Sequence, residues 1–181
     1  AVHQVKDVPL VFSVASDPVA IGLFSAADRP ANVTGTHDDP PLDELLKMAR
    51  MHDKTLRSVG MIYDASQANA RLSAEKLRLA GREQQVPVVE VTVSSLSELS
   101  IATQTLIQKG VSAILLGADN TINTGFPAIY QEASRAGVPV YGVAVELSEQ
   151  GASGVVGNDY FEWGRLSGIQ AARVIIGVPV A

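Results

Sequence analysis

Short apolar runs rich in β-branched residues alternate along this chain with segments of helical periodicity. The runs that favour strands are 8–14, 57–63, 86–93, 111–117 and 138–145. The segments that favour helices are 42–52, 68–84, 96–109 and 122–136. Strands that alternate with helices at this spacing predict βαβ units and a parallel sheet. Because the strands are apolar throughout, we expect helices on both faces of the sheet, which gives a three-layer α/β sandwich.

Glycine and proline residues mark the ends of these elements. Gly110 and Gly137 follow predicted helices, at the position where a left-handed residue commonly ends a helix. Pro9, Pro87 and Pro139 lie at the start of three of the runs, where a proline removes no hydrogen bond from the sheet. These positions favour the same element boundaries as the apolar pattern.

Both ends of the chain depart from this alternation. Residues 15–40 are rich in Asp, Pro, Gly and Ser and enclose a strand-like stretch at 31–37. A Gly-rich stretch at 151–158 precedes a long helical segment, for which Asp159 is a plausible N-cap and Gly177 a plausible end.

The apolar residues of this last helix need a surface against which to pack. The helices of the central block already cover the predicted sheet, so the last helix needs a different partner. We therefore predict that 1–36 and 158–181 belong to a separate layer or lobe, which is incomplete in this chain. The two Gly-rich strands, within 31–37 and 151–158, would then cross between lobes.

Polar residues follow the predicted strands, at the edge of a parallel sheet where ligands bind. Helix 68–84 begins there, and its first amides and dipole suit a carboxylate, with Ser66 and Asn69 beside them. On a neighbouring strand end, Asp119 and Asn120 can hold an ammonium or hydroxyl group. An anion site beside a cation site predicts a zwitterion such as an amino acid, and Tyr63 or Phe12 can stack on a flat side chain.

Each of these residues also has an explanation without a ligand. Ser66 can be a plain N-cap of helix 68–84, and Asp17 before Pro18 can form a turn. Asp119 and Asn120 can simply begin helix 122–136. The sequence leaves these alternatives open.

Composition and motifs narrow the classes of function. The net charge is −5 with no basic stripe, which argues against nucleic acid and against an anionic membrane surface. There are no cysteines, and the three histidines have no metal-site spacing. No signal peptide is visible, and no nucleophile elbow, P-loop or dinucleotide motif follows a strand. We therefore expect a protein that is not an enzyme, with no catalytic residue, metal or cofactor.

Four stretches together resemble a known family. They are VFSVASDPVAIGLF with RPANVTG, GMIYDASQANA, ILLGADNT and GVVGNDYFEWGRLSGIQAARVIIG. Through nearly all of its length the chain resembles the substrate-binding proteins of ABC importers, most closely the group called tryptophan/tyrosine transport components. The resemblance implies a type I periplasmic-binding fold, in which two α/β lobes joined by three crossovers close on a solute. It also implies a periplasmic or extracytoplasmic protein that hands the solute to an ABC permease in the membrane.

The resemblance also implies a division of the chain. Family members carry roughly a hundred further residues at the front, which is most of a lobe, so we expect a truncated chain. By analogy, 42–150 is the nearly complete second lobe, 31–41 and 151–158 are hinge crossovers, and 1–30 and 159–181 are parts of the first lobe. Exposed apolar surface on an incomplete lobe would favour a homodimer.

Transferred by position, the resemblance implies a set of ligand contacts. Backbone donors of the turn would bind a carboxylate, and an acidic residue on the next loop would bind an ammonium group. The implied residues are Ser66, Gln67, Ala68 and Asn69 for the carboxylate, Asp119 with Asn120 for the ammonium, and Asp17 and Asp159 from the first lobe and hinge.

Two rival functions share this predicted fold. The first is the effector-sensing domain of a sugar-type repressor, which would need a DNA-binding head that these residues do not contain. The second is a flavodoxin-like enzyme that works through carboxylates at the strand ends, namely Asp17, Asp64, Asp119 and Glu146.

Overall fold

The structure is a computed structural model that describes residues 4–19, 22–25, 27–157 and 159–179. The chain divides into two compact units. Unit 1 comprises residues 1–39 and 158–181, and unit 2 comprises residues 40–157. Both boundaries fall inside the segments predicted as crossovers, 31–41 and 151–158, and the hinge role of those segments stays a prediction.

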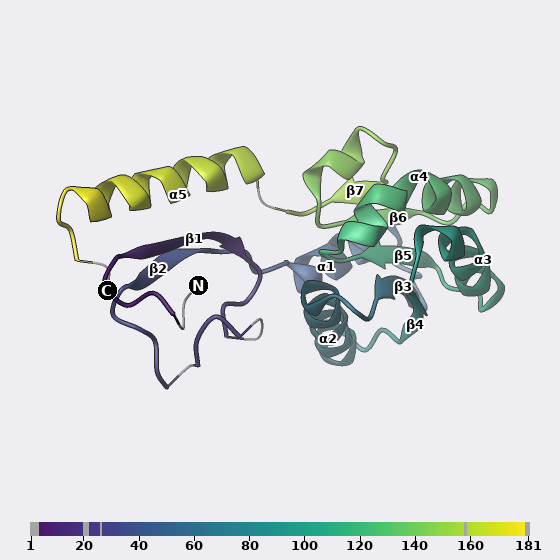
Figure 1. Ribbon diagram of the computed structural model, residues 1–181. Helices are drawn as coiled ribbons and strands as arrows, with labels where there is room; N and C mark the ends of the chain where they lie inside the picture. Colours follow the sequence, from purple (N-terminus) through teal and green to yellow (C-terminus); the bar gives the residue numbers. More distant parts are fainter. Residues whose placement is uncertain (1–3, 20–21, 26, 158, 180–181) are drawn as a thin grey trace. The chain divides into compact units, whose positions relative to one another are not determined.

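A parallel five-stranded sheet forms the centre of unit 2, with the strand order β4-β3-β5-β6-β7 (Figure 1). Every neighbouring pair in it is parallel. The strands are β3 Val59–Asp64, β4 Val88–Val93, β5 Ala113–Leu116, β6 Val140–Gly142 and β7 Gly154–Val155. The predicted parallel sheet is confirmed. Strand β6 ends earlier than the predicted 145 because residues 145–148 form a 3₁₀ helix, η2 Val145–Ser148.

Four helices alternate with these strands, as the periodicity predicted. They are α1 Leu42–His52, α2 Ala68–Glu83, α3 Leu99–Gln108 and α4 Asn120–Arg135, and a 3₁₀ helix, η1 Leu96–Glu98, leads into α3. Gly110 and Gly137, which follow α3 and α4, have φ of 73° and 67°. These left-handed values confirm the predicted role of both glycines at helix ends.

Apolar side chains pack on both faces of the sheet. Met61 contacts the core under α1 and α2, with Leu45 and Leu77. Its neighbour in β3, Ile62, contacts the core under α3 and α4, with Phe126. All six residues of β3 are buried, which explains why its sequence is apolar instead of alternating. The predicted three layers are therefore confirmed for unit 2.

The described residues of unit 1 form a parallel pair of strands, β1 Leu10–Ala15 and β2 Val33–His37, and one helix, α5 Tyr160–Ile175. Helix α5 packs against the strands, and the Ser167 hydroxyl lies 2.8 Å from that of Ser13 and 2.7 Å from that of Thr36. The Asp159 side chain accepts hydrogen bonds from the first amides of α5, so its predicted N-cap role is confirmed.

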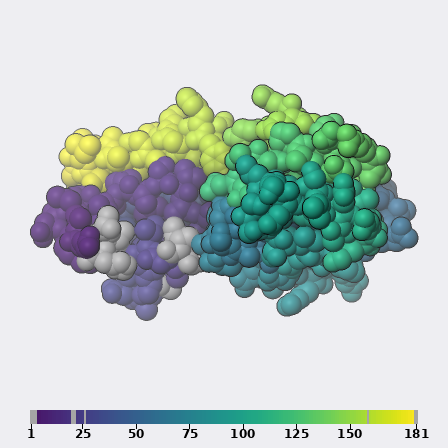
Figure 2. Space-filling view, turned by 45° about the vertical axis from the view of Figure 1, so that its right-hand side comes forward, coloured from purple at the N-terminus to yellow at the C-terminus, as the bar shows by residue number. Residues whose placement is uncertain are grey.

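Helix α5 also presents large apolar side chains at the surface of unit 1, where it is yellow in Figure 2. Phe161, Ile175 and Ile176 are each about four-fifths exposed, at 83%, 84% and 79%. The packing of α5 on β1 and β2 therefore covers only part of its apolar surface. In the described residues, no helix combines the length and hydropathy needed to cross a membrane.

Candidate functional site

Two loops meet at the carboxyl edge of the sheet in unit 2. The first follows β3 and leads into α2, and the second follows β5 and leads into α4. The backbone amide of Asp64 in the first loop donates to Oδ2 of Asp119 in the second, at 2.7 Å. Because β3 and β5 are adjacent parallel strands, their carboxyl ends lie together, which confirms the predicted convergence of these loops.

The Asp64 carboxylate accepts four hydrogen bonds. Its Oδ1 accepts from the amide and the hydroxyl of Ser66, at 2.9 and 2.6 Å. Its Oδ2 accepts from Nε2 of Gln67 at 3.1 Å and from the hydroxyl of Thr121 at 2.9 Å. These donors, with the Ser66 hydroxyl contributing most, hold the pKa of Asp64 far below its usual range. Asp64 is therefore a fixed negative charge that organises the first loop.

The Asp119 carboxylate also accepts hydrogen bonds from other residues of unit 2. It is 2% exposed and accepts from the amides of Asp64 and Ile122 and from Nε2 of Gln67. Burial raises its pKa, and the amide donors act in the opposite direction. Asp119 is the N-cap of α4, so the alternative in which it begins a helix is confirmed. Its predicted contact with an ammonium group stays a prediction.

Gln67 precedes the first residue of α2 and is its N-cap residue, without a side-chain capping bond. The alternative in which Ser66 is the plain N-cap is therefore wrong, because Gln67 has that position and the Ser66 hydroxyl donates to Asp64. The Gln67 side chain turns toward α4, where Oε1 accepts from the Asn120 amide at 3.2 Å and Nε2 donates to Thr121 at 2.8 Å.

The first turns of α2 and α4 differ in their free donors. In α4, the amides of Asn120 and Ile122 have acceptors in Gln67 and Asp119. In α2, the amides of Ala68, Asn69 and Ala70 have no acceptor within the part of the chain that the structure describes. Ala70 is 0% exposed, so the unpaired amides of the half-buried Ala68 and Asn69, with the positive end of a sixteen-residue helix, are the donors that remain available to an anion.

The other predicted contact residues differ in how exposed their side chains are. Tyr63 is 8% exposed and packs in the core under α1 and α2, where its hydroxyl lies against Arg78. Asn120 is exposed at the start of α4, and Asn69 is half-buried in the first turn of α2. The stacking role of Tyr63 stays a prediction.

Asp17 and Asp159 belong to unit 1. Oδ1 of Asp17 accepts from the amide of Val19 at 2.8 Å, which confirms the turn alternative for this residue. Asp159 begins α5. Their predicted contacts with a ligand stay predictions.

Sequence reasoning named Asp64 only as a carboxylate of the enzymatic rival and missed its role as the organising acceptor, and it missed Thr121 as a donor. An Asp followed two residues later by Ser is a known local hydrogen-bonding pattern, which could have revealed the bond between Asp64 and Ser66. No sequence signal could have revealed the bond between Asp64 and Thr121, because 57 positions separate them.

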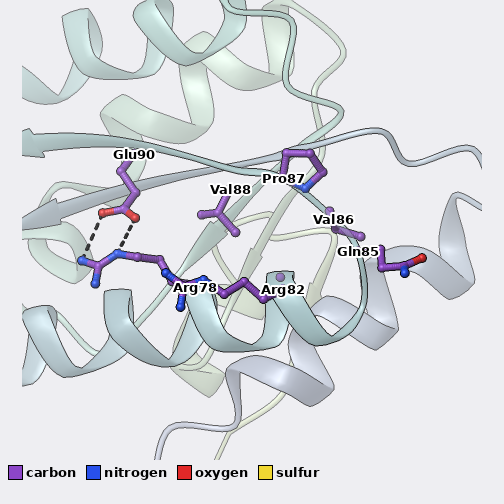
Figure 3. Close-up of a pocket in the computed structure, with 8 residues that line it drawn as sticks. Arg78, Arg82, Gln85, Val86, Pro87, Val88 and Glu90 are labelled. Atoms are coloured by element: carbon purple, nitrogen blue, oxygen red, sulfur yellow. Dashed lines mark hydrogen bonds and ion pairs between the residues drawn. The ribbon is translucent and has the colours of Figure 1, made fainter.

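A separate groove, with a volume of about 450 Å³, lies between α2 and β4 (Figure 3). An ion pair between Arg78 and Glu90 crosses it at 2.6 Å. The turn at residues 85–87, which leads into the amino end of β4, forms part of its wall. The strand-end loops lie at the opposite, carboxyl edge, so this groove is not part of the candidate site.

Comparison of the sequence with known proteins identifies a family and related proteins. The model of the family described as ABC transporter substrate binding protein matches residues 1–181. The chain is 27% identical over 181 residues to a tyrosine-binding protein from Clostridioides difficile (strain R20291), covering 99% of this chain and 52% of the relative.

Two solved structures show the same fold. A conserved domain protein from Vibrio cholerae has a TM-score of 0.86 and 29% identity, over 97% of this chain and 60% of that chain. The ABC domain in complex with L-Trp from Streptococcus pneumonia has a TM-score of 0.85 and 25% identity, over 98% of this chain and 62% of that chain. Two LacI regulators are 13 and 14% identical and a trehalose repressor from Escherichia coli is 16% identical, which shows a likeness of fold alone.

The chain thus spans about half the length of the curated relative and about three-fifths of the solved structures. The family match extends over the whole sequence, and the loops at the carboxyl edge lie within it. The chain belongs to the family of ABC transporter substrate binding proteins.

Proposed function

We propose that this chain is part of the solute-binding component of an ABC import system and that unit 2 binds the carboxylate of an amino-acid-like solute. The observation that carries the proposal is the pair of unpaired amides of Ala68 and Asn69, both half-buried, at the start of α2. A carboxylate at a helix N-terminus gains both hydrogen bonds and a favourable interaction with the helix dipole.

The chemistry of the relatives supports an aromatic amino acid as the solute. One relative is described as tyrosine-binding, and one solved structure holds L-Trp. Both ligands are zwitterions with a carboxylate that suits the amides of α2. The proposal includes binding without chemical conversion, an ABC permease as the partner, and an extracytoplasmic location, as in the family to which the chain belongs.

The test compares L-tyrosine with two analogues, tyramine, which lacks the carboxylate, and 3-(4-hydroxyphenyl)propionate, which lacks the ammonium group. A ligand that binds only the folded state adds about 2.7 kcal/mol to the free energy of unfolding at a hundred times its Kd. We expect thermal stabilisation by L-tyrosine and by the propionate, and none by tyramine.

Two results would contradict the proposal. Equal stabilisation by tyramine and L-tyrosine would show that the carboxylate is not what unit 2 holds. A lack of stabilisation by every amino acid and small carboxylate would remove the solute-binding function. If the protein instead converts the bound solute chemically during incubation, this would support the alternative that it is a flavodoxin-like enzyme.

A further inference from the structure

The side chain of Gln67 connects the two loops of the candidate site. Its Nε2 lies 3.1 Å from Oδ2 of Asp64, 3.2 Å from Oδ1 of Asp119 and 2.8 Å from Oγ1 of Thr121. Its Oε1 accepts from the amide of Asn120 at 3.2 Å. One side chain thus contacts the end of β3, the N-cap of α4 and the first two residues of α4.

The chemistry of this position requires a primary amide. Two carboxylate oxygens face the nitrogen of Gln67, so a donor is needed on that side. A backbone N–H faces the oxygen, so an acceptor is needed on the other side. A carboxylate would supply the acceptor and repel Asp64 and Asp119, and an apolar side chain would supply neither.

Gln67 is also the residue from which α2 begins. Its backbone is extended, with φ −88° and ψ 131°, and the next three residues carry the unpaired amides. Rotation of the backbone at Gln67 would redirect these amides. The backbone amide of Gln67 donates to the carbonyl of Asp64 at 3.1 Å, and the bonds from its side chain to Asp119, Asn120 and Thr121 are a second restraint on the backbone at this residue. Arg71 holds the other side of the loop by donating to the carbonyls of Ala65 and Ser66, at 2.8 and 3.1 Å.

We propose that Gln67 is a positioning residue, whose side chain fastens the start of α2 to the start of α4 and so holds the amides of Ala68 and Asn69 in the orientation that binds a solute carboxylate. The proposal rests on the proposed function of these amides. In this proposal the side chain of Gln67 contacts only the protein's own loops, and the solute contacts the backbone amides that follow Gln67.

The first arm of the test needs no solute. In Gln67→Met, which keeps the length of the side chain and removes the amide, the Asn120 amide loses its acceptor. We expect its hydrogen exchange, followed by NMR, to accelerate at least tenfold, while amides within α3 keep their rates. Unchanged exchange at Asn120 would overturn the proposal, whether or not any solute binds.

The second arm measures the affinity for L-tyrosine by calorimetry in Gln67→Glu. At pH 8 the introduced carboxylate would face Asp64 and Asp119, with Glu98 near Asp64. Arg71, in the first turn of α2, already donates to backbone carbonyls. We expect at least tenfold weaker binding than in the unmodified protein.

A lower pH should relieve this defect. The neighbouring carboxylates raise the pKa of the introduced group, so it gains a proton and becomes a donor again as the pH falls toward 5. We expect its affinity to approach that of the unmodified protein at pH 5, which a residue with only a packing role would not produce. Gln131→Glu makes the same change at an exposed position of α4 and is the matched control. It should bind L-tyrosine as tightly as the unmodified protein does at both pH 8 and pH 5.

The outcomes separate the two proposals. If the unmodified protein binds L-tyrosine and Gln67→Glu binds it equally at pH 8, the positioning role is overturned and the proposed function stands. If the unmodified protein binds no carboxylated solute, the proposed function fails. The exchange of the Asn120 amide then still decides whether Gln67 holds the two loops together.

Discussion

At the scale of single residues, the Asp64 carboxylate controls the conformation of the loop before α2. Charge-assisted hydrogen bonds are shorter and stronger than neutral ones, and Asp64 accepts four of them from Ser66, Gln67 and Thr121. It therefore acts through the shape of the loop, whereas the amides that follow carry the proposed contact with a solute.

The low pKa of Asp64 predicts a pH dependence of stability. A carboxyl group whose pKa is lowered by folding stabilises the protein at pH values above its ordinary pKa of 3.8, and this contribution is lost as the pH falls toward the pKa of the folded state. We expect Asp64→Asn to lower the Tm at pH 7 and to reduce the loss of Tm between pH 5 and pH 3. Scanning calorimetry checks this, with exposed Glu149→Gln as the control. If the Tm of Asp64→Asn falls between pH 5 and pH 3 as much as that of the unmodified protein, the prediction is contradicted.

A second prediction at this scale concerns the amide of Ala68. Proline is tolerated at the first position of a helix because its missing N–H has no partner within the helix. Ala68→Pro should therefore leave the circular dichroism intact and weaken binding of L-tyrosine about tenfold, since one donor to the carboxylate is lost. Ala68→Gly keeps the amide and is the matched control. Equal affinities for the two variants would show that this amide does not contact the solute.

At the scale of elements, the close approach of α2 to β5 decides where the donors lie. A Cβ atom at Gly117, directly after β5, would lie 2.3 Å from Cβ of Ser73 in α2. The Ser73 hydroxyl accepts from the amide of Ala118 at 3.0 Å, so the helix is also bonded to this strand end. Only a glycine permits this contact, which brings the start of α2 beside the loop that carries Asp119.

The contact predicts that Gly117→Ala is destabilising. Overpacking of a tight contact typically costs about 1 to 3 kcal/mol, and we expect a loss of this size in urea unfolding, with weaker binding of L-tyrosine. Adding Ser73→Gly removes the clashing Cβ but also the acceptor of the Ala118 amide, so we expect recovery of the clash energy less about 1 kcal/mol for a glycine within a helix and about 1 to 3 kcal/mol for the unpaired amide. Equal stability of Gly117→Ala and the unmodified protein would contradict the proposed tight packing.

At the scale of the whole molecule, the two units differ in how well their apolar residues are covered. Unit 2 has buried cores on both faces of its sheet. In unit 1, α5 covers β1 and β2 and leaves Phe161, Ile175 and Ile176 exposed. The predicted homodimer, which would cover such residues, stays a prediction.

Because unit 2 contains its own cores, residues 40–157 should fold alone. We expect the isolated segment to unfold cooperatively in urea and to give a dispersed NMR spectrum. It should also retain the bond between the Asp64 amide and Asp119, seen as slow exchange of that amide. A collapsed state without fixed packing would show that unit 2 depends on residues outside 40–157.

The sequence by itself determined the order of the elements, the parallel sheet and several helix ends. Helical and strand periodicities depend on local backbone geometry, so α1 to α5 and β1 to β6 lie close to the predicted ranges. The capping roles of Asp119 and Asp159 depend on residues two or three positions away, which a local pattern can indicate.

Only the tertiary structure decided how the residues of the candidate site are used. Ser66 and Gln67 bond to Asp64, and Gln67 also reaches residues 52 to 54 positions along the chain. Tyr63 points into the core because alternate residues of a strand face opposite layers. Hydrogen bonds between residues so far apart depend on which strands become neighbours and how closely their helices pack, and neither is encoded in the local pattern of the chain.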